Sequence, residues 1–110
     1  MVAGTAPRGG IAVGLSARLV AKAGSEDVVE ALLRAGQEMV ARELGTPVWF
    51  AFRIDAQTFG IFDAFADETG RQAHLGGALA AALVGRAEEL LAEPPTIEAV
   101  DVLEGKIVHG

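Results

Sequence analysis

Two aromatic-rich segments of strand length, joined by a short turn, constrain the fold of this chain more than any other feature. VWFAFRI spans residues 48–54 and TFGIFDAF spans residues 58–65, and apolar runs of this length are typical of β-strands. The sequence DAQT at their junction predicts a β-hairpin. A hairpin at the centre of the chain argues against a doubly wound parallel sheet, in which helices join consecutive strands.

The register of this hairpin decides which side chains share a face of the sheet. If residues 56–57 form the turn, Phe52 pairs with Ile61. Phe50 then pairs with Asp63, which is the only polar member of its face. The apolar members of that face are Val48, Phe50, Phe52, Ile54, Phe59, Ile61 and Phe65. The other face carries Trp49, Ala51, Arg53, Phe62 and Ala64. Both faces are mostly apolar, so we expect both to be covered, one of them by helices.

The segments before the hairpin predict a strand followed by a helix. Residues 11–22 alternate between apolar and polar side chains, which is typical of a half-buried strand. Ser25 is a suitable N-cap for a helix over residues 26–44, where apolar residues recur at helical spacing. Gly45 stands where a helix C-terminal glycine belongs, and Pro47 prevents continuation of the helix.

The segments after the hairpin predict a helix followed by a strand. Asp67 is the predicted cap of a helix that extends to about residue 92, with a kink or break at Gly76–Gly77. Residues 96–108 form the final predicted strand. The order β-α-β-β-α-β is that of the ferredoxin-like fold, an α+β fold in which two helices cover one face of a four-stranded antiparallel sheet.

Helices on one face leave the other face of such a sheet without cover. That face includes large apolar groups from several strands, and packing against a second copy of the chain would bury them. We therefore expect a homodimer whose two sheets close a barrel. Residues 11–110 are expected to form a single domain after a mobile tail over residues 1–10.

The composition excludes several kinds of chemistry and partner. The chain has 110 residues, a net charge of -6 and no cysteine, so disulfides and thiol chemistry are excluded. The acidic charge argues against binding to nucleic acid and to anionic membranes, which both need a basic patch. Arg18 interrupts the only apolar stretch near the start, and no apolar run is as long as a membrane span. We therefore expect a cytoplasmic protein.

The segment from residue 46 to residue 106 resembles the antibiotic biosynthesis monooxygenase domain, a family of the dimeric α+β barrel superfamily. The resemblance rests on W-x-x-x-R-x-D from Trp49 to Asp55, on the strand FGIFDAF, and on the run DETGRQAHL that contains His74. The family includes cofactor-free oxygenases of quinols and anthrones, haem-degrading enzymes and proteins with no established reaction. The resemblance thus implies a dimer that binds a small aromatic or hydrophobic ligand and needs no cofactor.

The resemblance also implies a site. Family members commonly have an acidic residue in the third strand and a histidine on the following helix, and the corresponding residues here are Asp63 and His74. A serine often follows that histidine by about three positions, where this chain has Gly77. The polyketide oxygenases of the superfamily use tyrosine and asparagine around the substrate, and the haem degraders share an asparagine. This chain has neither residue type, which argues against a close copy of either group.

Asp63 and His74 each have a catalytic and a structural interpretation. An acid among aromatic residues either has a raised pKa, which suits a general base near neutral pH, or is a buried acid satisfied by hydrogen bonds. His74 is either a base, an acid or the partner that orients Asp63, or it is a structural hydrogen-bonding residue. We predict that the two side chains lie within hydrogen-bond reach or are bridged by one water.

Aromatic and basic residues near Asp63 are the candidates for substrate binding. Trp49 shares a face with Arg53 and either stacks on a flat aromatic substrate or packs in a dimer interface. Arg53 either holds an anionic substrate oxygen or pairs with an acid, such as Asp55 or one from the partner subunit. The phenylalanines are core residues first and pocket lining second, and the candidates among them are Phe50, Phe62 and Phe65.

Two functions remain open from the sequence. The first is a cofactor-independent monooxygenase in which Asp63 or His74 takes a proton from a quinol- or anthrone-type substrate, and the substrate anion reduces oxygen directly. The second is a non-catalytic dimeric module that binds a small hydrophobic ligand or acts in stress response. No group of histidine and acidic residues has the spacing of a metal site, and His109 has no expected role.

Overall fold

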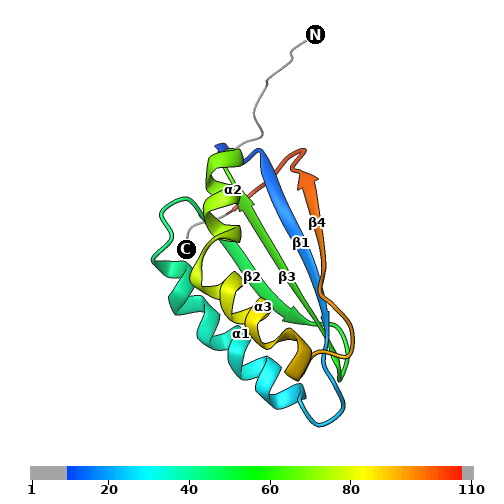
Figure 1. The fold of residues 1–110 in the computed structure, drawn as a ribbon. Coiled ribbons are helices and arrows are strands. Elements are labelled where there is room, and N and C mark those ends of the chain that lie inside the picture. Colours follow the sequence, from blue (N-terminus) through cyan, green and yellow to red (C-terminus); the bar gives the residue numbers. More distant parts are fainter. Residues whose placement is uncertain (1–9, 108–110) are drawn as a thin grey trace.

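A computed structural model describes residues 10–107 of the chain, as four strands and three helices (Figure 1). In chain order the elements are β1 (Val13–Val20), α1 (Glu26–Ala41), β2 (Val48–Arg53), β3 (Thr58–Phe65), α2 (Glu68–Leu75), α3 (Ala78–Leu90) and β4 (Thr96–Asp101). The predicted break at Gly76–Gly77 is confirmed, and it divides the second helix into α2 and α3. Residues 1–9 of the predicted tail, and His109, lie outside the described residues.

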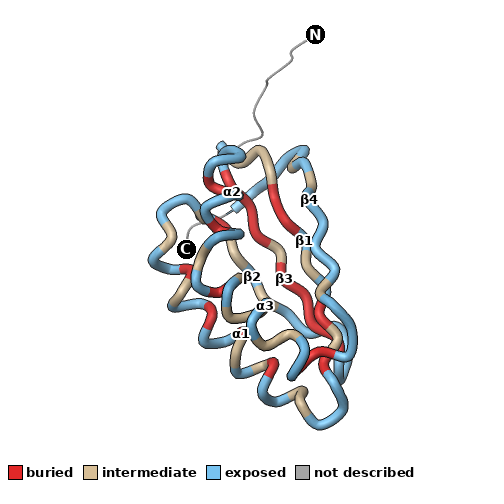
Figure 2. Tube along the Cα trace, viewed as in Figure 1, coloured by how far each residue is buried: buried red, intermediate tan, exposed pale blue. Residues whose placement is uncertain are grey.

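The strands form one antiparallel sheet in the order β2-β3-β1-β4. This order, with the helices on one face of the sheet, is the predicted ferredoxin-like α+β fold (Figure 1). α2 packs over β1 and β3, α1 packs on β2, and α3 packs against α1. β4 is an edge strand and is mostly exposed (Figure 2). Within residues 10–107, no helix is long and apolar enough to cross a membrane.

The main core lies between the helices and the central strands. In β3, every residue except Phe62 is buried (Figure 2). The buried apolar cluster that joins the helices to the sheet consists of Leu19, Ala21, Val29, Leu33, Phe59, Ile61, Leu90 and Leu91. Because burial of apolar surface is the main driving force of folding, this cluster fixes the helical layer over the face of β3 that also carries Asp63.

The predicted hairpin forms, but its predicted register is wrong by one residue. Phe52 lies opposite Gly60, and Phe50 lies opposite Phe62. Residues 54–57 separate β2 from β3. Because Ile54 pairs with Thr58 through a backbone hydrogen bond, the turn itself has three residues, 55–57, instead of the predicted two. A change of one residue in loop length shifts the pairing of β2 against β3 by one position.

Asp55 stabilises the longer loop. Its Oδ1 accepts hydrogen bonds from the backbone N–H groups of Gln57 and Thr58, at 3.0 and 2.8 Å, as aspartate side chains commonly do in turns. The N–H of Ile54 donates to the carbonyl of Thr58 at 2.8 Å and closes the loop. The sequence DAQT therefore encodes a turn, but one built around the Asp55 side chain.

The observed register places Trp49 on the helix-covered face with Asp63. These two residues are direct partners across β2 and β3. Phe50 and Phe52 lie on the opposite face, where they are 62% and 47% exposed. Phe62 lies on that face too, opposite Phe50. The predicted face that combined Phe50 with Asp63 is therefore wrong.

α1 ends earlier than the sequence predicts. It ends at Ala41, with Arg42 as its C-cap, and Leu44 is fully exposed. Gly45 is not the helix cap, since Arg42 holds that position, and it packs against Gly70 of α2 instead. A Cβ atom on Gly45 would lie 3.2 Å from the Gly70 Cα atom. This contact between two glycines lets the loop after α1 approach α2 closely.

The two predicted N-caps behave differently. Asp67 caps α2, since its side chain accepts a hydrogen bond from the N–H of Gly70 at 3.0 Å. Ser25 occupies the N-cap position of α1 but makes no side-chain capping bond. The N–H of Gly24 donates to Glu26 Oε1 at 2.6 Å at this end of the helix. The cap that forms as predicted is thus that of α2, the helix that carries the candidate histidine.

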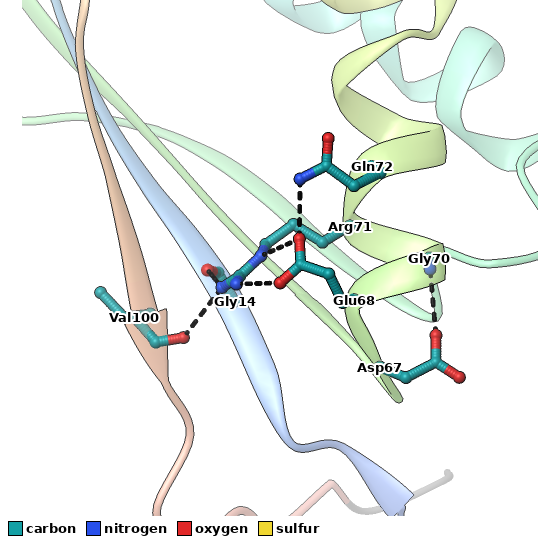
Figure 3. A network of polar contacts seen from close by, with 7 residues as sticks. All are labelled: Gly14, Asp67, Glu68, Gly70, Arg71, Gln72 and Val100. Atoms are coloured by element: carbon teal, nitrogen blue, oxygen red, sulfur yellow. Dashed lines mark hydrogen bonds and ion pairs between the residues drawn. The ribbon is translucent and has the colours of Figure 1, made fainter.

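Arg71 of α2 holds the pair of strands β1 and β4 (Figure 3). Its Nη1 donates to the carbonyl oxygens of Gly14 and Val100, at 3.2 and 3.4 Å, and these two residues are direct partners in the sheet. Arg71 also forms an ion pair with Glu68, one turn earlier in α2. These contacts orient α2 on the sheet and so help to place His74.

Candidate functional site

His74 is buried between two carboxylates. Its Nε2 lies 3.0 Å from Asp63 Oδ2, and its Nδ1 lies 2.6 Å from Glu43 Oε1. Only 7% of the His74 side chain and 3% of the Asp63 side chain are exposed. The predicted proximity of Asp63 and His74 is therefore confirmed, and the contact is direct. We refer to Glu43, Asp63 and His74 as the acid–histidine cluster.

Three separate segments build the acid–histidine cluster. Asp63 is a buried residue of β3, the strand on which α2 packs. His74 lies in the last turn of α2, with its ring centroid 5.5 Å from that of Phe65. Glu43 lies in the loop between α1 and β2, where Thr46 Oγ1 donates to Glu43 Oε1 at 2.8 Å. Each nitrogen of the imidazole thus faces an acceptor that a different element supplies.

The two carboxylates keep the His74 imidazole protonated. Burial alone would lower the pKa of His74, but the hydrogen bonds and charges of Asp63 and Glu43 outweigh burial and raise that pKa from 6.5 to about 9. An imidazolium donates from both ring nitrogens, which matches an acceptor at each of them. At neutral pH His74 is therefore a cation, and it is not a proton acceptor.

Two buried polar atoms at this position have no hydrogen-bond partner. Among the described residues, the buried side-chain nitrogen and oxygen atoms without a partner are Trp49 Nε1 and Asp63 Oδ1. Their residues are direct cross-strand partners, and the Cβ atoms of such partners lie about 5 Å apart. One atom is a donor and the other is an acceptor. A hydroxyl group is the kind of group that can both accept from an N–H and donate to a carboxylate oxygen.

The chain is similar to proteins of solved structure. It is 46% identical to the NE2512 protein of Nitrosomonas europaea, a protein of unknown function, with a TM-score of 0.87 over 91% of this chain and 97% of that one. The chain belongs to the NE2512 family. No family model and no curated protein matches it.

This NE2512-family chain has the fold of the antibiotic biosynthesis monooxygenases. A Caulobacter crescentus protein provisionally assigned to that group is 21% identical, with a TM-score of 0.74 over 86% of this chain and 92% of that one. A protein named antibiotic biosynthesis monooxygenase is 18% identical, with a TM-score of 0.73 over 83% of this chain and 98% of that one. At these identities the likeness establishes the fold. The resemblance predicted from the sequence is thereby confirmed at the level of structure.

The predicted site phenylalanines of this NE2512-family chain divide between the two faces of the sheet. Phe65 is fully buried and lies beside His74 on the helix-covered face. Phe50 and Phe62 lie on the opposite face of the sheet, opposite one another. The structure therefore brings Phe65 and Trp49 to the acid–histidine cluster, and it does not bring Phe50 and Phe62 there.

Arg53 pairs with Glu30 of α1 and not with Asp55, the acid named from the sequence. Its Nη1 lies 2.8 Å from Glu30 Oε1, and its Nη2 donates to the carbonyl of Ala56 at 3.3 Å. The guanidinium carbon lies 4.6 Å from the centroid of the Phe59 ring, a cation–π contact. These contacts hold Arg53 at the wall of a cavity beside β2.

A cavity of about 610 Å³ opens between α1 and the edge of β2, a size typical of small-molecule sites. It is lined by Glu30, Leu33, Arg34, Gln37, Trp49, Ala51, Phe52, Arg53 and Phe59. Neither Asp63 nor His74 belongs to this lining. Trp49 does, and Trp49 is also the cross-strand partner of Asp63. The indole is therefore the link between the cavity and the acid–histidine cluster.

The acid–histidine cluster is not built as a metal site. In the part of the chain that the structure describes, no three or more His, Cys, Asp or Glu side chains are arranged to hold a metal ion. Both nitrogens of His74 already face carboxylate oxygens. The arrangement suits the holding and transfer of protons.

Glu43 is the member of the cluster that the sequence did not predict. A carboxylate just beyond the C-terminus of a helix faces the negative end of the helix dipole, which is unfavourable. Glu43 follows the C-cap of α1 directly, and this position was the available sign that it needs a cationic partner. The partner is His74, 31 residues further along the chain.

The raised pKa of His74 predicts that the fold loses stability in mild alkali. Such a group stabilises the fold fully below its unfolded pKa, 6.5, and this contribution is lost as the pH rises through about 9. The chain has no cysteine and no tyrosine, so few other groups titrate in this window. We expect the free energy of unfolding in urea to fall by on the order of 2 kcal/mol across it.

Two variants control this measurement. His109→Gln removes the other histidine of the chain and should leave the pH dependence unchanged, whereas His74→Gln should abolish it. A wild-type stability that stays constant, or that rises over this pH window, would contradict the assignment of His74 as a buried cation.

Proposed function

We propose that this chain is a cofactor-independent monooxygenase for a flat aromatic substrate of the quinol or anthrone type. The observation that carries the proposal is the pair of buried, unpartnered polar atoms, Trp49 Nε1 and Asp63 Oδ1. A phenolic or enolic hydroxyl group can accept a hydrogen bond from the indole and donate one to the carboxylate. The monooxygenase names of structural neighbours support the same class of reaction.

Asp63 is the proton acceptor in this proposal. The sequence left the choice between Asp63 and His74 open, and the protonation of His74 favours Asp63. His74 keeps its proton up to a pH of about 9, and it binds Oδ2 of Asp63 at 3.0 Å. Oδ1 of the same carboxylate has no partner. His74 therefore orients Asp63, and Oδ1 takes the substrate proton.

The reaction then balances without a further redox group. For an anthrone, Oδ1 takes a proton from the enolised substrate, and the anion passes one electron to O2. The resulting substrate radical and superoxide combine to form a carbon–oxygen bond, and the peroxide anion takes the proton back from Asp63. Loss of water from this hydroperoxide leaves a carbonyl group, so a CH2 group and O2 become C=O and H2O. The protein contributes deprotonation, positioning and a water-excluding environment.

The cavity beside Trp49 is the proposed route by which an aromatic substrate reaches Asp63. Its lining combines aromatic and aliphatic side chains with the charged groups of Arg53 and Glu30. A flat ring can stack on Trp49 in this setting. Movement of the indole toward or away from the cavity would open the path to its cross-strand partner Asp63.

A homodimer is the proposed assembly of the chain. The face of the sheet without helices carries Phe50, Phe52 and Ile54, which are 62%, 47% and 56% exposed. Such a group of large apolar side chains on one face is typical of an interface. A second copy packed on this face would bury the phenylalanines that do not reach the acid–histidine cluster.

A non-catalytic ligand-binding module is the second candidate function. It is favoured by the lining of the cavity, which includes Trp49 and Arg53 but not Asp63. In that case the acid–histidine cluster would hold α2 on the sheet, and the cavity would bind a small aromatic molecule. This function predicts binding of the same aromatic compounds without consumption of oxygen.

Oxygen uptake with reduced naphthoquinols and anthrones tests the proposed reaction. We expect uptake above the rate of autoxidation, and we expect Asp63→Asn to reduce kcat by about 100-fold or more, because the general base is lost. Trp49→Phe keeps an aromatic ring at this position but removes the indole N–H, so it should also lower kcat. Asp27→Asn, the same change at an exposed position of α1, is the matched control and should leave the rate unchanged.

Uptake that stays at the autoxidation rate for the folded wild type would contradict the monooxygenase proposal. Uptake that survives Asp63→Asn would contradict the assigned base. Binding of the compounds, seen as quenching of Trp49 fluorescence without uptake, would support the second candidate function.

Sedimentation equilibrium tests the proposed dimer. The wild type should sediment at twice the 11.3 kDa of one chain, and Phe52→Glu should shift it toward the single-chain mass by placing a charge in the interface. Val84→Glu is the control, because Val84 is 72% exposed on α3, away from the proposed interface. A wild type that remains at the mass of one chain throughout the micromolar range would contradict the dimer.

A further inference from the structure

We propose that Glu43 is a positioning residue of this site, and that Gly77 leaves the space that allows its carboxylate to reach His74. The inference deepens the proposed function and rests on it for the catalytic consequence. The geometry of the contact is independent of any substrate. Glu43 acts through His74 on Asp63, without contact to the substrate.

The Glu43 carboxylate is held on both of its sides. Oε1 accepts from Thr46 Oγ1 at 2.8 Å and faces His74 Nδ1 at 2.6 Å. Oε2 faces Gly77, and a Cβ atom at that position would lie only 2.6 Å from it. The Glu43 side chain is 18% exposed, so it has little room to move away from any of these groups.

Gly77 is required for space and not for its backbone conformation. Its φ of -85° and ψ of -179° are angles that any residue adopts. A Cβ atom would, however, also lie 3.2 Å from the carbonyl oxygen of His74. The neighbouring Gly76 is different, since a Cβ atom there would make only ordinary contacts, the nearest at 3.6 Å from the carbonyl of Gln72. Gly77 therefore leaves the space that the Glu43 carboxylate occupies, whereas Gly76 is not needed for that space.

The approach of Glu43 to α2 depends on a second close contact. Gly45 follows Glu43 by two residues, and a Cβ atom on Gly70 would lie 2.7 Å from the carbonyl oxygen of Gly45. This contact brings the loop after α1 against the first turns of α2. Glu43 then reaches the last turn of the same helix, where it meets His74.

The role of Glu43 follows from the charges around the imidazole. The titratable groups that face His74 are Asp63 from β3 and Glu43 from the loop, and Gly77, the N-cap of α3, lies against the Glu43 carboxylate. With both acids in place, His74 stays cationic and holds Asp63 Oδ2, which leaves Oδ1 for the substrate. Without Glu43, the imidazole would lose its Nδ1 proton at a lower pH. Its Nε2–H would still donate to Asp63 Oδ2, but the positive charge that acts on the Asp63 carboxylate would be lost near neutral pH.

A titration of His74 by NMR tests the inference without any substrate. The imidazole carbon–proton signals of His74 and His109 are followed against pH, and His109→Gln assigns them. We expect Glu43→Gln to lower the pKa of His74 by roughly one to two pH units, because an opposite charge at hydrogen-bond distance is lost. Gly77→Ala should lower it by a smaller amount, since it displaces the carboxylate but keeps the charge nearby.

Gly76→Ala is the matched control and should leave the pKa of His74 at the wild-type value. A folded Glu43→Gln variant, and a folded Gly77→Ala variant, that both titrate like the wild type would overturn the inference. The Gly77→Ala result keeps the test decisive even if Glu43→Gln does not fold.

The pH profile of kcat separates positioning from mere packing. If Glu43 acts through His74, the alkaline limb of the profile moves to lower pH in Glu43→Gln by the same shift that NMR records. A lowered pKa with an unmoved alkaline limb would overturn the positioning role. If the wild type consumes no oxygen at all, the proposed function fails, and the NMR shift still decides whether Glu43 and Gly77 hold the charge of His74.

Discussion

The contact of one buried imidazolium with two carboxylates is the interaction on which the rest of the site depends. It joins the loop after α1, the strand β3 and the helix α2. A buried charge without a partner is costly, and removal of one member of a buried ion pair costs about 3–5 kcal/mol. His74 therefore fixes Asp63 and Glu43 as firmly as they fix His74. The sheet supplies Asp63 at a fixed position, and α2 must be placed accurately above it for the contact to form.

Close packing of backbone atoms supplies this accuracy. Gly45 and Gly70 bring the loop and α2 together, and Gly77 leaves room for the Glu43 carboxylate. Arg71 connects α2 to β1 and to the edge strand β4, because it donates to a backbone carbonyl group of each (Figure 3). One oxygen of Asp63 has no partner, and neither does the indole nitrogen of its cross-strand partner Trp49. The packing of α2 on the sheet and the proposed proton transfer thus depend on the same three side chains, those of the acid–histidine cluster.

The order of the elements and the fold could be predicted from the sequence, because periodicity is a local property, whereas the contact of Asp63 with His74 was predicted only through the family resemblance. The hairpin register could not be predicted, since two-residue and three-residue loops fit DAQT equally well, and only the hydrogen bonds of Asp55 decide between them. That one-residue shift moved Phe50 away from Asp63 and brought Trp49 opposite it. The place of Glu43 just after the C-cap of α1 indicates that it needs a cationic partner, but the identity of that partner could not be predicted, because His74 lies 31 residues further along the chain.

Neutron diffraction from crystals grown in heavy water near neutral pH tests the central claim most directly, because it locates the protons of the acid–histidine cluster. The account predicts deuterium on both Nδ1 and Nε2 of His74, and none on either oxygen of Asp63. A single deuterated ring nitrogen would show that the two carboxylates do not hold His74 as a cation. A deuterated Asp63 would show that its free oxygen is not a proton acceptor, and either result would contradict the account.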